Sequence, residues 1–183
     1  IMTTETNIHR DSRLAKLQTL QEQGYNPYPY RFKPSHKAAD LQKKYENLEA
    51  GAETEDEVVV AGRAMAVRNS GMFIDMKDAS GKIQLFCHKN NLDEENLARL
   101  KELDVGDIVG VKGFIRRTPR GELSIAAKSF DIISKSLQPL PEKFHGLTDI
   151  GARYRQRYVD FIMNDESRAV FETRCKILSL IHI

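Results

Sequence analysis

The chain has 183 residues, with 28 lysines and arginines against 26 acidic residues, and a formal net charge of +2. Hydrophobic residues make up 40% and charged residues 30%, a balance typical of a folded globular protein and not of a disordered one. The near-neutral total excludes a uniformly basic chain but allows a local basic surface. No apolar run approaches the roughly 20 residues of a membrane-spanning helix, and the first residues lack the apolar core of a signal peptide, so we expect no membrane partner.

Histidines and cysteines give no indication of a metal site or a disulfide framework. The five histidines lack metal-ligand spacing, and neither cysteine lies in a C-x-x-C pair. The sequence contains no glycine-rich phosphate loop, zinc-protease motif or nucleophile-elbow motif. We therefore expect Cys87 and Cys175 to be reduced, mostly buried thiols, and we expect no metal site and no catalytic residue.

The N-terminal residues predict a helical region. Apolar residues recur at spacings of three and four over 8–20, and Gly24 is placed to end this helix. Residues 25–34 contain three prolines among four aromatics, which predicts an extended connector whose aromatic side chains pack onto a neighbour. A second helix is predicted over 35–48, with Ser35 as its N-cap.

An acidic segment over 49–57 is expected to be a loop, and from Val58 the hydrophobic period changes to two. A helical pattern lies at 91–106, between the third and fourth of five predicted strands. The strands are predicted at 57–68, 72–77, 82–87, 107–117 and 122–133. The order β-β-β-α-β-β is that of an OB-fold, a five-stranded Greek-key barrel whose sheet face binds oligonucleotides. Another α+β sheet also accommodates five strands; the position of the helix favours the OB-fold.

Side-chain alternation places two phenylalanines on the polar face of the hairpin formed by the second and third strands. The predicted pairs are Lys77 with Lys82, Asp75 with Gln84 and Phe73 with Phe86. The apolar side chains of both strands then share the opposite face, and Glu122 of the last strand is expected to reach the polar one. An exposed aromatic on an OB strand stacks an unpaired base, and a nearby amide hydrogen-bonds the base edge. The alternative is that another part of the chain covers Phe73 and Phe86.

Basic residues near this face are candidates for phosphate contacts. Between Asp107 and Lys128 there are five basic and two acidic residues, an excess that the chain total hides. The candidates in this segment are Lys112, Arg116, Arg117 and Arg120. Arg63 and Arg68 lie in or just after the first strand. The alternative is a solvated charged hairpin; beside exposed aromatics, the cluster favours single-stranded nucleic acid.

After residue 135 the pattern changes again. A linker with two prolines is expected over 136–148, and two helical patterns follow at 150–163 and 167–181. The last pattern reaches the end of the chain without a cap, so we expect a truncated helix.

Four strings resemble, in this order, the N-terminal part of bacterial lysyl-tRNA synthetases. The strings are VAGRAMAVRNSGMFIDMKDASGKIQLF, RRTPRGELSI, PLPEKFHGL and ARYRQRYVDFIMNDESR. These class II enzymes share an N-terminal OB-fold anticodon-binding domain with the aspartyl and asparaginyl enzymes. The resemblance is most specific in PLPEKFHGL and YRQRYVD, where related synthetases diverge, and the long helical extension before the barrel also suits the lysyl enzyme.

The resemblance implies roles for particular residues. Phe73 would stack on the central anticodon uridine, and Gln84 would hydrogen-bond its edge. Arg68 would hold the same base or its phosphate, and Glu122 would lie near the anticodon. We group Arg63 with these candidate anticodon-binding residues.

The resemblance also implies a domain order and an activity. The domains would be a helical extension (1–54), an anticodon-binding OB-fold (55–135), a linker (136–148) and the start of a truncated class II catalytic domain (149–183). The full-length enzyme would be a cytoplasmic homodimer that uses ATP and magnesium to form lysyl-adenylate and transfers lysine to lysine tRNA.

In the family the active-site motifs come further downstream. We therefore expect the chain alone to be inactive, with no cofactor bound. Two alternatives remain open: a stand-alone OB module for single-stranded nucleic acid, and an aspartyl- or asparaginyl-type anticodon domain.

Overall fold

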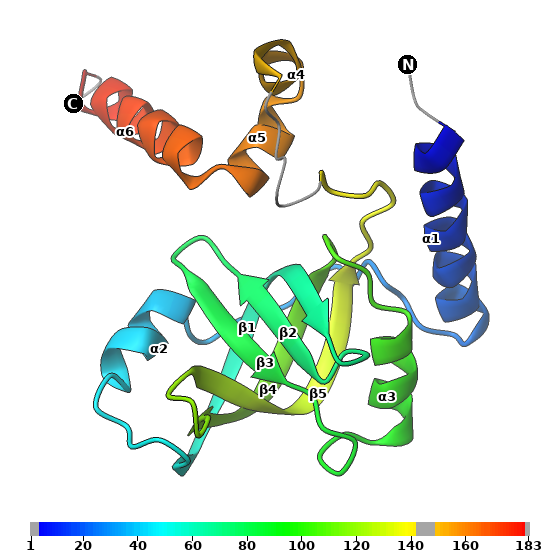
Figure 1. The fold of residues 1–183 in the computed structure, drawn as a ribbon, viewed down its shortest axis with the longest axis vertical. Helices are drawn as coiled ribbons and strands as arrows, with labels where there is room; N and C mark the ends of the chain where they lie inside the picture. The colour runs from blue at the N-terminus through cyan, green and yellow to red at the C-terminus, as the bar shows by residue number, and fades with distance from the viewer. Residues whose placement is uncertain (1–3, 142–148, 182–183) are drawn as a thin grey trace. The chain divides into compact units, whose positions relative to one another are not determined.

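The computed structural model describes residues 4–141 and 149–181, so most of the linker expected over 136–148 lies outside the described residues. The chain divides into two compact units, Ile1–Pro139 and Leu140–Ile183, and each is described by itself. In the first unit the predicted order is confirmed: two helices, then five strands with a helix between the third and the fourth (Figure 1). The elements are α1 (Thr4–Glu22), α2 (Ala38–Lys44), β1 (Glu53–Arg68), β2 (Phe73–Lys77), β3 (Lys82–Phe86), α3 (Glu94–Lys101), β4 (Ile108–Arg117) and β5 (Leu123–Ser134).

The five strands close into a barrel in the order β1-β2-β3-β5-β4. β3 and β5 run parallel, and the other neighbouring pairs are antiparallel. β1 is 16 residues long and pairs with both β2 and β4, so a single strand joins the two edges of the sheet. This closed five-stranded sheet, with its helix between β3 and β4, confirms the predicted OB-fold.

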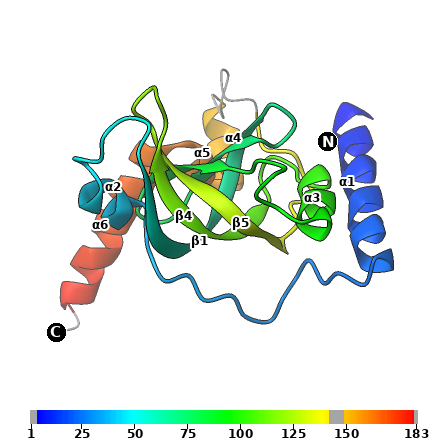
Figure 2. The same cartoon turned by 90° about the horizontal axis from the view of Figure 1, so that it is seen from below.

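The helices of this unit lie on two sides of the barrel. α2 lies on one side, and α3 and then α1 lie on the other (Figure 1 and Figure 2). α3 is attached to β5 because Oδ1 of Asn96 accepts a hydrogen bond from the main-chain N–H of Phe130 at 2.7 Å. α1 is followed, as predicted, by Gly24, whose φ of 75° lies in the left-handed region that favours glycine.

β2 and β3 pair in the predicted register. Phe73 lies opposite Phe86, and Asp75 lies opposite Gln84. The apolar residues of the same strands are buried, as the alternation predicted; they include Ile74, Met76, Ile83 and Leu85. The hairpin therefore divides into an apolar inner face and a polar outer face that carries both phenylalanines.

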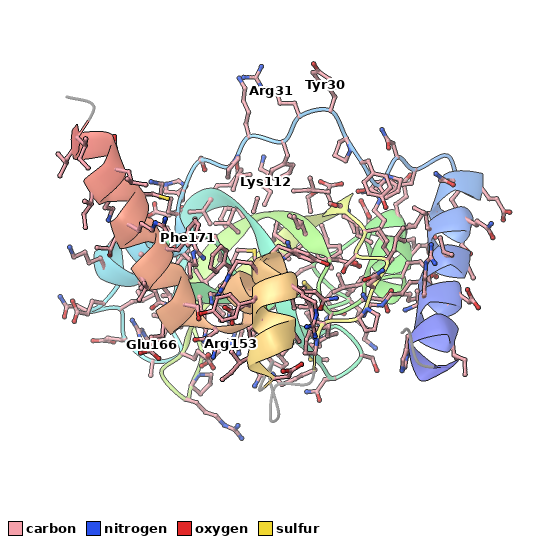
Figure 3. The ribbon with its side chains drawn as sticks, turned by 90° about the horizontal axis from the view of Figure 1, so that it is seen from above. Tyr30, Arg31, Lys112, Arg153, Glu166 and Phe171 are labelled. Atoms are coloured by element: carbon pink, nitrogen blue, oxygen red, sulfur yellow. The ribbon has the colours of Figure 1, made fainter. Side chains whose placement is uncertain are left out.

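The connector between α1 and α2 packs Tyr25 and Phe32 onto the barrel, as predicted, whereas Tyr28 and Tyr30 are exposed. The hydroxyl of Tyr25 donates a hydrogen bond to the main-chain oxygen of Ile132 at 2.9 Å. The ring of Phe32 lies against Gly110, where a β-carbon would come within 2.4 Å of a ring atom. Tyr30 is fully exposed and points away from the connector (Figure 3).

α2 is shorter than predicted, and Ser35 is not its N-cap. The helix begins at Ala38, and Oγ of Ser35 instead accepts a hydrogen bond from the N–H of Val59 at 3.1 Å. The first N–H groups of α2 are satisfied from the β2–β3 turn. Asp78 accepts from Ala38 at 2.8 Å, and Ser80 accepts from the next residue at 3.0 Å. Because these acceptors are distant in sequence, the local pattern placed the start of the helix too early.

Two smaller expectations were also wrong. β1 begins at Glu53, so the strand takes in part of the segment predicted as a loop. Of the two free cysteines, Cys87 is buried but Cys175 is exposed. Burial raises the pKa of the Cys87 thiol to about 12. Within the described part of the chain, no helix is both long and apolar enough to cross a membrane.

The described part of the second unit contains three helices. They are α4 (Ile150–Arg155), α5 (Arg157–Met163) and α6 (Asp165–Ile181). The pattern predicted as one helix over 150–163 is divided at Gln156, whose φ of −119° and ψ of 55° are not helical. Asp160, with 1% of its side chain exposed, forms ion pairs with Arg153 at 2.9 Å and Arg157 at 2.8 Å. A buried carboxylate with two arginines therefore fastens α4 to α5; Figure 3 labels Arg153.

A buried ion pair joins the start of β4 to the end of β5. Nζ of Lys135 lies 2.7 Å from a carboxylate oxygen of Asp107, and both side chains are fully buried. Lys135 also lies 2.6 Å from Asp104, and the other oxygen of Asp107 accepts a hydrogen bond from the N–H of Ser136 at 2.7 Å. Arg13 of α1 donates to the main-chain oxygen of Ser136 at 2.7 Å, so α1 is attached at the same point.

Removing the buried lysine is expected to destabilise the barrel strongly. In the Lys135→Met variant, the fully buried carboxylate of Asp107 loses its counter-charge. We expect the free energy of unfolding, measured by urea denaturation, to fall by about 3–5 kcal/mol. Lys16→Met removes the half-buried partner of Asp104 and should cost about 1 kcal/mol or less. Equal losses in the free energy of unfolding in the two variants would contradict a dominant role for the buried pair of Lys135 and Asp107.

The same cluster is expected to make stability depend on pH. Burial alone raises the pKa of Asp104, but hydrogen bonds from Lys135 and Lys16 outweigh it, so the pKa lies below its usual value. A carboxyl with a lowered pKa in the folded state stabilises the protein above the unfolded pKa of about 4, and this stabilisation is lost as the pH falls through the folded pKa. The stability difference between the native chain and Asp104→Asn should therefore be constant above about pH 5 and shrink as the pH falls from there through the lowered pKa of the folded state. Urea denaturation at each pH measures this difference in the free energy of unfolding. A difference that stays constant as the pH falls would contradict the lowered pKa of Asp104.

Candidate nucleic-acid interface

A shallow pocket of about 500 Å³ lies on the polar face of the β2–β3 hairpin and between two turns. Its walls come from the β1–β2 turn, the outer faces of β2 and β3, the end of β4 and the β4–β5 turn. The lining residues are Arg68, Asn69, Phe73, Gln84, Phe86, Arg116, Thr118, Pro119, Arg120 and Glu122. Six of the nine residues predicted to bind nucleic acid therefore meet in one place.

The two phenylalanines of the pocket have different surroundings. Their ring centroids are 5.2 Å apart. The guanidinium carbon of Arg116 lies 4.4 Å from the ring centroid of Phe86, and the ring of His88 stacks on Phe86 at 5.7 Å. Both rings are half-buried. Phe86 is partly covered by Arg116 and His88, whereas the ring contact of Phe73 is with Phe86 itself. Phe73 is the better placed of the two to stack on an incoming base.

Gln84 presents a buried amide to the pocket. Its side chain is nearly inaccessible, at 7%, and its Nε2 donates a hydrogen bond to Oε2 of Glu122 at 3.1 Å. Among the described residues, Oε1 of Gln84 has no hydrogen-bond partner. The hydroxyl of Ser124, which lies opposite Gln84 on β5, is likewise buried and unpartnered within the described chain. Buried polar atoms are normally hydrogen-bonded, so an unpaired acceptor here is a natural place for a donor on a ligand.

Arg68 lies at the edge of the pocket, where β1 ends. Its Nη2 is 2.5 Å from Oδ1 of Asp75, and about half of its side chain is exposed. The β1–β2 turn that follows it has three successive residues with positive φ: Asn69, Ser70 and Gly71. A β-carbon on Gly71 would come within 3.0 Å of Leu100, so only glycine fits this tight turn between the barrel and α3.

Two of the four predicted phosphate contacts line the pocket. Arg116 stacks on Phe86 and lies 3.3 Å from the carboxylate of Glu53. Arg120 is exposed in the β4–β5 turn. Together with Arg68, they place three positive charges around the aromatic and amide groups of the pocket.

The other three basic residues of the predicted set lie outside this pocket, for identifiable reasons. The guanidinium of Arg117 donates to main-chain oxygens of Gly121 and Tyr45, both at 2.6 Å. Lys112 is paired with Glu57 at 3.0 Å. Arg63 donates to the main-chain oxygen of residue 106 at 2.6 Å, and burial lowers its pKa. Arg63 and Arg117 are thus engaged by main-chain oxygens of the same unit, and Lys112 lies away from the pocket lining, so the three are separated from the cluster with which they were grouped.

The turns contribute pocket residues that the sequence had not singled out. Asn69, Thr118 and Pro119 line the pocket. Thr118 also fixes the β4–β5 turn, because its Oγ accepts a hydrogen bond from the N–H of Glu122 at 3.0 Å. Strand alternation assigns faces only within strands, so it carries no information about turns; the segment TPRG between two predicted strands was the available signal.

Comparison with known families identifies the class of this domain. Residues 58–133 match the family described as OB-fold nucleic acid binding domain, tRNA anti-codon. The matched segment runs from β1 to β5 and includes the hairpin and the β4–β5 turn that form the pocket. This part of the chain is therefore similar, over the whole barrel, to OB-fold domains of the tRNA anti-codon family.

The chain as a whole is similar to lysine–tRNA ligases. It is 51% identical over 179 residues to the lysine–tRNA ligase of Rhizobium leguminosarum bv. trifolii, an alignment that covers 96% of this chain and 36% of that relative. It is 48% identical over 176 residues to the chloroplastic/mitochondrial lysine–tRNA ligase of Arabidopsis thaliana, covering 93% of this chain and 29% of the relative. The chain thus spans about a third of the length of these relatives. The resemblance to the lysyl-tRNA synthetases is confirmed over nearly its whole length.

Because Arg120 lines the pocket and Lys112 does not, we expect substitutions of these two residues to affect RNA binding differently. Arg120→Gln should weaken the binding of single-stranded RNA, because one phosphate contact is lost. The plot of the logarithm of the association constant against the logarithm of the salt concentration should become less steep by about 0.7. The matched change Lys112→Gln, outside the pocket, should leave the slope unaltered. Fluorescence anisotropy over a salt series measures both. A larger effect of Lys112 than of Arg120 would contradict the pocket as the binding surface.

Proposed function

We propose that the pocket binds the anticodon loop of lysine tRNA and that the chain is the anticodon-binding part of a lysine–tRNA ligase. One observation carries the proposal: half-buried Phe73 lies beside the buried, unsatisfied amide oxygen of Gln84, in a pocket with arginines around it. Stacking on an aromatic ring accepts any base, and an amide beside it reads one base edge.

In this proposal each group of the pocket has a distinct task. The central anticodon uridine stacks on Phe73, which Phe86 supports from the neighbouring strand. Gln84 hydrogen-bonds the base edge. Arg68, Arg116 and Arg120 are near enough to the pocket to neutralise phosphates, which positions the loop without reading its sequence.

For the whole protein we infer ATP-dependent attachment of lysine to its tRNA, through lysyl-adenylate, by a homodimer in the cytoplasm. The names of the relatives and the anticodon-binding fold support this inference. ATP and magnesium would serve that reaction elsewhere in the protein. Among residues 4–141 and 149–181, no cluster of three or more His, Cys, Asp or Glu side chains is arranged to hold a metal ion. We expect this chain alone to be inactive, because it spans about a third of the length of the lysine–tRNA ligases that it matches.

Replacing the stacking ring tests the proposal. Phe73→Ala should weaken binding of a synthetic lysine anticodon stem-loop by about 1–3 kcal/mol, because one base–aromatic stack is lost. Phe171→Ala is the matched control, since Phe171 lies on α6 in the other unit, and it should leave the affinity unchanged. Isothermal titration calorimetry measures both, and circular dichroism checks that each variant is folded. Unchanged affinity in a folded Phe73→Ala variant would exclude the stacking role.

The same assay separates this proposal from its alternatives. Stem-loops with the anticodons of lysine, aspartate and asparagine tRNA are titrated against the native chain. The lysine stem-loop should bind most tightly. Tighter binding of either other loop would favour an aspartyl- or asparaginyl-type domain, and equal binding of all three would favour a general single-strand-binding module.

A further inference from the structure

The hydrogen bond between Gln84 and Glu122 joins two strands that are far apart in sequence. Gln84 is on β3, and Glu122 directly precedes β5, with which β3 forms the parallel pair of the barrel. The main chain of Glu122 is held by two hydrogen bonds to Thr118: its N–H donates to Oγ at 3.0 Å, and its oxygen accepts from N–H at 2.9 Å. Gly121, with a φ of 86°, completes this turn. The main chain that carries the exposed side chain of Glu122 is therefore fixed beside the pocket.

A carboxylate in this position determines which way the amide of Gln84 is oriented. An ionised carboxylate only accepts hydrogen bonds, whereas an amide has a donating and an accepting end. Nε2 of Gln84 must therefore face Glu122, as the 3.1 Å hydrogen bond requires. The reversed amide would place its oxygen against the carboxylate, an unfavourable contact between two acceptors in a site where Gln84 is 93% inaccessible.

The fixed orientation has a consequence for the base that the amide can read. It leaves Oε1 as the unpaired acceptor of the buried side chain, with the second hydrogen of Nε2 beside it. The N3 position of uracil carries a hydrogen and is flanked by carbonyl oxygens, so it complements this arrangement. The N3 of cytosine is an acceptor and would meet Oε1 without a hydrogen between them. The pocket thus favours uracil over cytosine because of the orientation of one amide.

We propose that Glu122 is a positioning residue that fixes the orientation of the Gln84 amide and thereby sets the preference of the pocket for uracil over cytosine. This inference rests on the proposed function, because it requires that an unpaired base enter the pocket. It assigns Glu122 a role that requires no direct contact with the RNA: the carboxylate acts through Gln84.

Glu122→Gln is the informative substitution, because a glutamine can both donate and accept. Either orientation of Gln84 then finds a partner at position 122, and the amide is no longer fixed. The substitution also removes a negative charge, which strengthens the binding of every RNA alike and therefore does not alter a ratio of affinities. Arg120→Gln, two residues away and also in the pocket wall, is the matched control: it changes charge without contacting the amide.

The test measures the affinities of two synthetic stem-loops that differ only in the middle anticodon base, which is uridine in one and cytidine in the other. Each stem-loop is titrated against the native 183-residue chain and against both variants. The native chain should prefer uridine by roughly 10- to 100-fold, the range expected of one two-point contact with a base edge. Glu122→Gln should reduce this ratio to within about threefold, chiefly by improved binding of the cytidine loop. Arg120→Gln should weaken both loops and preserve the ratio.

The outcomes separate the two hypotheses. If the native chain prefers uridine and Glu122→Gln keeps the full ratio, the positioning role of Glu122 is refuted while the proposed function stands. If the native chain binds neither loop, the proposed function fails. If it binds both loops equally, base reading by Gln84 fails, and with it the positioning role. A loss of preference in Arg120→Gln as well would show that any change in the turn disturbs the pocket, and would also overturn the specific role of Glu122.

Discussion

The buried ion pair between Lys135 and Asp107 is the constraint on which the barrel depends. Asp107 directly precedes β4 and Lys135 directly follows β5, and the two strands pair from Ile108 opposite Ser134 onward. A pair with both charges fully buried tolerates no sliding of one strand against the other, because a shift would leave a charge without its partner in the interior. The register is thus fixed at one end of the β4–β5 ladder. The other end of the same ladder carries the turn that bears Glu122.

The pocket combines rigid and adjustable groups. Gln84 and Phe86 lie on paired strands and are held by neighbours on both sides, so the site that we propose for a base is formed before any ligand binds. Two arginines at its rim are held by ion pairs with partly exposed carboxylates, Arg68 with Asp75 and Arg116 with Glu53, and such pairs contribute little to stability. They can therefore exchange a carboxylate for a phosphate at small cost. A preformed base site with an adjustable charged rim suits the recognition of a flexible single-stranded loop.

Much of the fold and part of the site could be predicted from the sequence, because both follow from short-range patterns. The β2–β3 register was predictable because side chains alternate with a period of two and the connecting turn is short, so one pairing places all the apolar residues on one face. That register also placed Phe73, Phe86 and Gln84 together on the outer face. The start of α2 was mispredicted because Asp78, which caps it, is 40 residues further along the chain.

The sequence by itself determined the order of the elements, the two faces of the hairpin and the presence of a basic cluster beside it. Only the tertiary structure decided which basic residues are free to bind a ligand. Arg117 ends β4 and Arg120 lies three residues further on, in the β4–β5 turn, and both are equally basic. Arg117 is nevertheless occupied by main-chain oxygens that include Tyr45, 72 residues away, while Arg120 remains exposed at the pocket. The orientation of the Gln84 amide was decided in the same way, because its acceptor on Glu122 reaches it only when β3 and β5 pair in the closed barrel. The charge of a side chain is a property of the residue. Whether that side chain can contact a ligand depends on which hydrogen-bond acceptors the fold brings within its reach.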